Sequence, residues 1–244
     1  MQVADPVAEP DDAQGVRCGD VVLCALLSEL DWQETIMLSW ERSRLRKAAG
    51  RYAAHGWPVR PGAFLTARHA VGHARQRRFH CGTPGCPTVA CHPTGLPVTF
   101  GEEAAAALWQ EHPYTVLLPT GYAFDVLEVP AALGRATLLA DGFEAARGPV
   151  AVAPGERWMF LVLPGHGLLP ELSAHPGVLL HGQDSWVPAP PSPQFGGRVR
   201  WELPPDAHSW KPAEPYAVQA LMLDAIGAGP PSTAVRRTAW RAVA

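Results

Sequence analysis

Two short apolar runs lie close together near the middle of the chain, at residues 115–118 and 123–129, on either side of a Pro-Thr-Gly corner. Each run is rich in β-branched or bulky apolar residues and is too short for a helix, so both are predicted to be strands. Glu128 lies inside the second run, between two apolar neighbours. A buried carboxylate is unfavourable unless it is paired or bound to a metal, so Glu128 is a candidate functional residue.

The same analysis of apolar and polar positions predicts the remaining elements. Helices are predicted at residues 31–55, 102–112, 131–147 and 216–226. Two further strand pairs are predicted, each around a turn: 148–153 with 157–163, and 178–181 with 185–189.

These elements together predict an α+β fold. We expect a mainly antiparallel sheet that carries residues 115–118, 123–129 and 157–163, with helices flanking it. We divide the chain into an N-terminal segment at 1–30 whose start is disordered, one domain at 31–205, and a C-terminal helix with a loose basic tail at 206–244.

Composition narrows the class of protein without naming its partner. The 244 residues are enough for one large domain with an ample core. No apolar run approaches the ~20 residues of a membrane span, and the acidic N-terminus lacks a basic-then-apolar signal pattern, so we expect a cytoplasmic protein with no membrane partner. The net charge of −3 argues against a strongly basic nucleic-acid binder but says nothing about local patches.

A loop rich in cysteine, glycine and proline spans residues 80–93. Thiolates and imidazoles at such spacing suit tetrahedral zinc, so the loop is predicted to hold a structural zinc ion. Cys91 and His92 are adjacent and cannot easily both bind one ion, which leaves His80, His69 or His73 as alternatives for the fourth ligand. A loop of free cysteines is the other interpretation. The predicted ligands are Cys81, Cys86, Cys91, His92 and His80.

Basic side chains gather in two places. One set precedes the cysteine loop and could follow a phosphate backbone, with a solvated loop as an equal alternative; it comprises Arg68, Arg75, Arg77 and Arg78. The other set lies on the helix predicted at residues 31–55, where we favour a solvated helix face over a nucleic-acid surface; it comprises Arg42, Arg44, Arg46, Lys47 and Arg51.

Several motifs follow one another in a recognisable order. They are Gly-Trp-Pro-Val at 56–59, the cysteine loop with its His-Pro, a Trp-bearing helix that ends in His-Pro at 112–113, Pro-Thr-Gly at 119–121, Ala-Pro-Pro-Ser at 189–192, and a Gly-to-Trp strand at 197–201. Over roughly residues 45–205 the chain resembles the N-terminal prim-pol domain of bifunctional DNA primase/polymerases, of the archaeo-eukaryotic primase type. The resemblance implies a role in DNA replication, DNA as the partner, and nucleotidyl transfer on Mg²⁺ or Mn²⁺.

The residues at the family's catalytic positions differ from the family pattern. The resemblance places Glu128 at the first metal-binding acid and Pro130 at the second, and proline has no ligand atom. Asp125 precedes Glu128 by three residues, so a regular strand directs the two carboxylates to opposite faces. The nucleotide-contacting histidine falls on Trp158, and the third acid falls near Leu179 or Leu180.

These departures favour a prim-pol domain that has kept its shape and lost catalysis, and that acts as a nucleic-acid-binding or nucleotide-binding module. One alternative is an active primase/polymerase in which an irregular strand brings Asp125 and Glu128 to Mg²⁺ or Mn²⁺. A second alternative is a structural or protein-interaction module with a protein partner. The expected contacts to nucleic acid or nucleotide are Arg157, Ser192, Arg198, Arg200, Arg75, Arg77 and Arg78.

Overall fold

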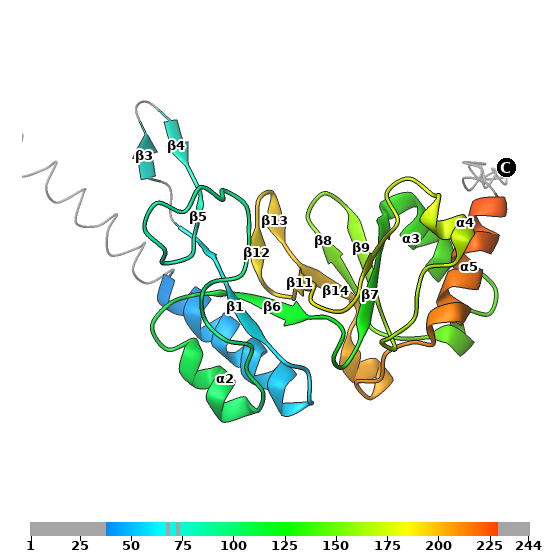
Figure 1. Cartoon of the computed structure of the whole chain (residues 1–244), viewed down its shortest axis with the longest axis horizontal. Coiled ribbons are helices and arrows are strands. Elements are labelled where there is room, and N and C mark those ends of the chain that lie inside the picture. The colour runs from blue at the N-terminus through cyan, green and yellow to red at the C-terminus, as the bar shows by residue number, and fades with distance from the viewer. Residues whose placement is uncertain (1–37, 67–68, 72–73, 229–244) are drawn as a thin grey trace, which may run out of the picture. The chain divides into compact units, whose positions relative to one another are not determined.

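The computed structural model describes residues 38–66, 69–71 and 74–228 (Figure 1). The chain divides into one unit at residues 1–40 and another at 41–244. The elements below belong to the second unit, apart from residues 38–40, which begin its leading helix. The predictions made for residues 1–37 and for the basic tail after residue 228 lie outside the described residues.

A three-stranded antiparallel sheet forms the first layer of this unit. Its strands, in spatial order, are β1 (Arg60–Gly62), β6 (Thr115–Pro119) and β11 (Trp186–Pro188). The helix at residues 38–54 and α2 (Glu102–Leu108) pack against this sheet through apolar side chains such as Leu45 and Ala105.

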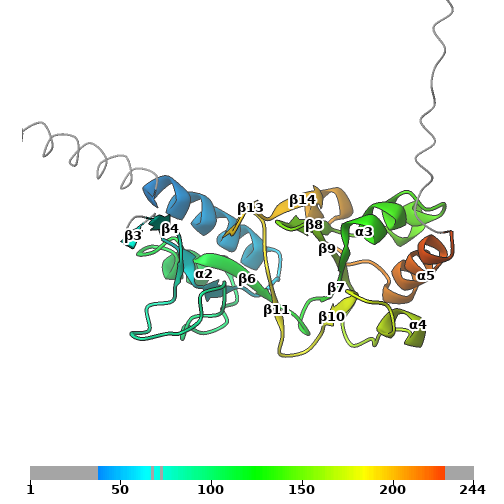
Figure 2. The same cartoon turned by 90° about the horizontal axis from the view of Figure 1, so that it is seen from above.

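A five-stranded antiparallel sheet forms the second layer. In spatial order its strands are β10 (Leu179–His181), β7 (Asp125–Pro130), β9 (Arg157–Val162), β8 (Val150–Ala153) and β14 (Arg200–Leu203). Three helices lie on the same side of β7 and β9 in both views (Figures 1 and 2). They are α3 (Ala131–Leu138), α4 (Pro170–Ser173) and α5 (Pro215–Gly227).

Strand β7 lies between two hydrophobic cores and contributes side chains to both. Val126 is buried in a core shared with the three-stranded sheet and the helix at 38–54. Leu127 and Val129 are buried in the other core, under α3 and α5. Because successive strand residues point to opposite faces, a strand between two cores is apolar on both sides, and Glu128 is the exception on the face of Val126.

The remaining elements are short. Three two-stranded pairs form: β2 (Phe64–Leu65) with β5 (Phe79–His80), β3 (His69–Val71) with β4 (Ala74–Gln76), and β12 (Pro193–Gln194) with β13 (Gly197–Arg198). Two 3-10 helices complete the described residues, η1 (Phe143–Ala146) and η2 (Pro205–His208).

Two expectations about strand pairing are wrong. Residues 115–118 do not share a sheet with 123–129 and 157–163, because β6 belongs to the three-stranded sheet. Residues 178–181 and 185–189 do not pair with each other, because β10 pairs with β7 and β11 pairs with β6. The chain therefore passes between the two sheets three times, after β6, after β10 and after β11.

The Pro-Thr-Gly corner connects the first two of these crossings. Thr120 donates hydrogen bonds from its backbone N to the Ser185 carbonyl (3.1 Å) and from its hydroxyl to the Gly182 carbonyl (2.5 Å). Gly121 has a φ of 85°, and a Cβ there would lie 2.6 Å from Cα of Gln183. Only glycine allows this close approach of the two backbones. The corner at residues 119–121 therefore holds the segment after β6 against the segment after β10.

The fold class is confirmed as α+β with mostly antiparallel sheets. The strand pair predicted at 148–153 and 157–163 is also confirmed, as β8 and β9. Within the described residues, no helix combines the length and the apolar character needed to cross a membrane.

Candidate functional site

Glu128 lies at the centre of a polar network on the face of β7 that looks toward the first core. The network starts from neighbouring strands, since Glu128 is paired with Met159 on β9 and with Leu179 on β10. Arg157 donates from Nε to Oε1 of Glu128 (2.6 Å), and His181 contacts Oε2 through Nε2 (2.8 Å). Both carboxylate oxygens of Glu128 are therefore engaged by protein groups.

Further hydrogen bonds hold both partners of Glu128 in place. Arg157 also donates from Nη2 to the Gly177 carbonyl (2.7 Å), just before β10. The other ring nitrogen of His181, Nδ1, lies 3.1 Å from the hydroxyl oxygen of Ser185. The His181 imidazole is therefore held at both ring nitrogens, and the Arg157 guanidinium is held at Nε and Nη2. Side chains from three segments of the chain together order the network.

The electrostatics of Glu128 follow from this arrangement. Burial by itself raises the pKa of the Glu128 carboxyl, but the hydrogen bonds and charges of His181 and Arg157 outweigh burial, and the pKa is lowered. The ionised form is thus the stable one, as expected for a carboxylate whose oxygens both accept charge-assisted hydrogen bonds.

Asp125 faces the opposite side of the same strand. Its side chain is 3% exposed, and Oδ2 accepts a hydrogen bond from the backbone N of Gly165 (2.8 Å). The register of β7 against β9 runs without a break from Asp125 to Pro130, so no bulge turns the two carboxylates toward each other. The structure does not bring Asp125 and Glu128 to a common metal.

Among the described residues, the other positions that the resemblance assigns to catalysis carry no metal ligand either. Pro130 follows Glu128 on the same face and is paired with Arg157. Trp158 is buried in the core under α3, where it contacts Gly134. Leu179 is half exposed beside Glu128. The described residues thus supply one carboxylate to this face of the sheet, and an arginine and a histidine occupy it.

A cavity of about 420 Å³ opens in front of Glu128. The sheet contributes Glu128 and His181, the three-stranded sheet contributes Trp186, and the cysteine loop contributes Ala90 and Cys91. The predicted metal loop therefore forms one wall of the cavity in front of Glu128.

Three of the predicted metal ligands converge, as expected. The ligand atoms of Cys81, Cys86 and His92 all lie within 4.8 Å of one another. His92 Nδ1 lies 2.8 Å from the Ala90 carbonyl, and Nε2 faces the Cys86 sulfur at 3.5 Å. A histidine that donates from Nδ1 to a carbonyl keeps the lone pair of Nε2 for a metal, so the cluster has the donor types and the orientation of a zinc site.

Hydrogen bonds prepare one of these thiols for metal binding. Thr83 stabilises the Cys81 thiolate through its side chain and backbone, and His92 and Cys86 add to the effect, so the pKa of Cys81 falls to about 6. Because the thiolate is the metal ligand, a thiol that ionises below neutral pH binds a metal with little competition from protons.

The other predicted ligands do not join this cluster. Cys91 packs against Ala63, Leu65 and Phe79, and burial raises the pKa of its thiol. His80 is exposed, and its Nδ1 accepts a hydrogen bond from the backbone N of Gly82 (3.2 Å). The structure does not describe the side chains of His69 and His73.

Most of the predicted nucleic-acid contacts are committed to the protein itself. Ser192 is fully buried and bonds to the backbone of Val116. Arg198 pairs with Glu41, and Arg200 pairs with Glu202. Arg157 holds Glu128. Of the predicted contacts whose side chains the structure describes, Arg77 and Arg78 are exposed and form no ion pair; the side chain of Arg75 is not described.

His181 is a residue of this site that was not predicted from the sequence. The sequence shows that this histidine is close to Leu179 and Leu180, where the resemblance places the third acid. It does not show which residue of β7 the histidine pairs with. The antiparallel pairing of β10 with β7 places His181 opposite Val126, on the same face as Glu128, and only that pairing shows that the imidazole reaches the carboxylate.

Comparison with known proteins was made at three levels. Neither the curated proteins nor the solved structures returned a match. The family model described as "Bifunctional DNA primase/polymerase, N-terminal" matches residues 49–216, which is more than half of the chain and includes both sheets and the cysteine loop. The chain therefore belongs to the prim-pol family of bifunctional DNA primase/polymerase N-terminal domains.

Proposed function

We propose that this chain is a prim-pol domain without nucleotidyl transfer, which acts as a nucleic-acid-binding or nucleotide-binding module. The observation that carries the proposal is the occupation of both Glu128 oxygens by Arg157 and His181. Two-metal catalysis needs carboxylates that converge on ions about 3.5–4 Å apart, to activate the attacking hydroxyl and to stabilise the leaving group. A single carboxylate that is already paired does not meet this requirement.

The Arg157 guanidinium supplies positive charge where the family uses a divalent cation. For Mg²⁺ to reach Glu128, the charge-assisted hydrogen bonds from Arg157 and His181 would have to break, and no second carboxylate on this face of β7 would repay the loss. Arg157 thus supports a sheet face that keeps its shape without metal.

Binding of nucleic acid does not depend on that chemistry. Arg77 and Arg78 lie exposed next to β5 and the cysteine loop, and both can contact phosphates. We further propose that Cys81, Cys86 and His92 hold a structural zinc ion, because the cluster has zinc-type donors and an oriented imidazole. The ion would fix the loop that follows these arginines.

Primer extension and de novo priming with Mg²⁺ or Mn²⁺ test the loss of catalysis. We expect no synthesis by the natural sequence, on templates that an active primase/polymerase copies in parallel. Robust synthesis that disappears in Glu128→Ala would contradict the proposal and restore the polymerase. Binding is tested separately by titration with fluorescent single-stranded DNA at several salt concentrations. Absence of binding to DNA and to nucleotides would leave the protein-interaction alternative.

A further inference from the structure

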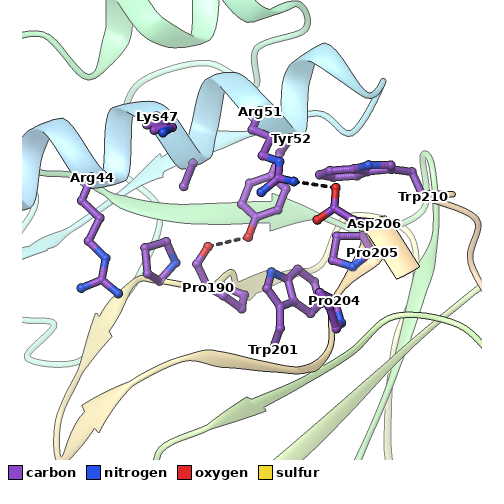
Figure 3. Close-up of a pocket in the computed structure, with 12 residues that line it drawn as sticks. Arg44, Lys47, Arg51, Tyr52, Pro190, Trp201, Pro204, Pro205, Asp206 and Trp210 are labelled. Atoms are coloured by element: carbon purple, nitrogen blue, oxygen red, sulfur yellow. Dashed lines mark hydrogen bonds and ion pairs between the residues drawn. The ribbon is translucent and has the colours of Figure 1, made fainter. Parts of the chain in front are cut away.

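A second cavity lies between the helix at residues 38–54 and the segments that carry Pro190 and Trp201 (Figure 3), and it shares no lining residue with the cavity at Glu128. Its volume is about 280 Å³. The lining residues come from the helix, from the Pro190–Pro191 segment, from Trp201 on β14 and from residues 204–210. The volume is slightly below the range of roughly 300–1,000 Å³ usual for small-molecule pockets, so the cavity suits one flat ring system and not a large ligand.

Rings and prolines form the walls of this cavity. Tyr52 is buried and donates its hydroxyl to the Pro190 carbonyl (2.5 Å), which joins the helix to the proline segment (Figure 3). The Trp201 ring is partly exposed and lies edge-on to Tyr52, with ring centroids 6.3 Å apart. Such a surface accepts an aromatic ring of any base, because every base has a π face.

A fixed ion pair closes one end of the cavity. Arg51 contacts Asp206 at 2.5 Å, and its guanidinium carbon lies 5.6 Å from the centre of the Trp210 ring. Figure 3 shows Arg51 between Tyr52 and Trp210, pointing to Asp206. Arg51 therefore has a positioning role, and its charge is already balanced.

Two further cations stand at the rim without a partner. Arg44 and Lys47 line the cavity, both side chains are exposed, and neither forms an ion pair within the described residues. They are three residues apart on a helix, so they lie on one face, about 4.5 Å apart along the axis. The rim thus carries two free positive charges beside an aromatic depression.

We propose that this cavity is a contact site for single-stranded nucleic acid, with one base on Trp201 and the adjoining phosphates on Arg44 and Lys47. A cationic edge beside stacking rings is the combination that binds a single strand irrespective of sequence. The inference rests on the proposed nucleic-acid binding and assigns part of it to a site that is separate from the sheet face at Glu128.

The test compares the salt dependence of binding to a short fluorescent oligonucleotide. The variants are Arg44→Ala/Lys47→Ala and, as a matched control, Arg46→Ala, which removes an exposed charge of the same helix that does not line the cavity. Each lost contact to a single-stranded phosphate changes the slope of log K against log salt by about 0.7. We expect a slope shallower by about 1.4 in the double variant, by the same relation, and an unchanged slope in Arg46→Ala.

Photo-crosslinking reports on the base without altering the fold. An oligonucleotide that carries 5-iodouracil should crosslink to the peptide that contains Trp201, and the double variant should lose this crosslink. Equal slopes in all three proteins, or crosslinks only elsewhere, would overturn the inference while the proposed function stands. A cavity that binds mononucleotides would also overturn it. In that case a mononucleotide would displace the oligonucleotide from the wild type, and the double variant would lose mononucleotide binding to the same extent. A wild-type protein that binds no DNA and no nucleotide would instead remove the proposed function itself.

Discussion

Arg157 stands directly across the sheet from Pro130 and donates a hydrogen bond of 2.6 Å to Glu128, two residues before that proline. Glu128 is thus paired with a cation from the neighbouring strand. This ion pair gives the Glu128 face of β7 a role in stability that can be measured.

Arg157→Ala should lower the free energy of unfolding by about 1–3 kcal/mol, because it leaves a half-buried carboxylate with one partner fewer. Urea denaturation at neutral pH measures the change. The control is Arg135→Ala, which removes an exposed ion pair with Glu156 and should change stability by less than about 1 kcal/mol. Equal effects of the two substitutions would show that the Glu128 network contributes no more than a surface pair.

The stability from Glu128 should depend on pH in a defined direction. The folded state lowers the pKa of this carboxyl below its ordinary value of 4.5. The contribution is therefore fully present above pH 4.5 and is lost as the pH falls through the lower folded-state pKa. Glu128→Gln should be less stable than the wild type at neutral pH, and the difference should shrink on acidification. A difference that grows as the pH falls would contradict the assigned charge state.

Zinc should bind through Cys81, Cys86 and His92. We expect one zinc ion per chain by elemental analysis, lost in Cys81→Ser and in Cys86→Ser. Cys91→Ser is the matched control, since Cys91 lies in an apolar cluster outside the ligand set, and it should retain the ion. Zinc in none of these proteins, or zinc lost only with Cys91, would show that the three-residue cluster is not the site.

In the metal-free protein, Cys81 should be more reactive than Cys91. Because Thr83 and the neighbouring donors lower the pKa of Cys81 to about 6, its alkylation rate should rise with pH and reach half its maximum near that value. Cys91, whose pKa is raised by burial, should react slowly across the same range. Mass spectrometry of peptides after timed iodoacetamide treatment distinguishes the two. A half-point for Cys81 near the value of an ordinary thiol would contradict the hydrogen-bonded thiolate.

Gly134→Ala should destabilise the protein although alanine favours helices. A Cβ at this position of α3 would lie 2.5 Å from Cγ of Trp158. Overpacking of this kind costs about 1–3 kcal/mol, which exceeds the gain of about 1 kcal/mol from helix propensity. Gly227→Ala at the end of α5 is the control, since nothing lies within 4 Å of a Cβ there, and it should be neutral or stabilising. Thermal unfolding of both variants decides the matter.

Local sequence patterns were sufficient for much of the fold. Alternating and continuous apolar runs predicted β7, β8 and β9, and the fold class followed from them. The spacing of Cys81, Cys86 and His92 within a glycine- and proline-rich loop predicted their convergence. Residues so close along a chain that can turn sharply are easily brought together. The three-residue offset of Asp125 and Glu128 predicted their opposite faces, because the period of a strand is fixed by its backbone.

What the sequence could not decide is which strands pair and what each polar group meets. Residues 178–189 have the form of a hairpin, yet their two strands join different sheets, because Thr120 and Gly121 hold the turn between the layers. That long-range pairing alone brings His181 to Glu128. The charges of Arg157, Arg198 and Arg200 looked available for phosphate in the sequence, and the tertiary structure gives each a carboxylate partner. Local periodicity is set by the backbone and is written in neighbouring residues, whereas the partner of a buried charge is set by the packing of segments far apart in the chain.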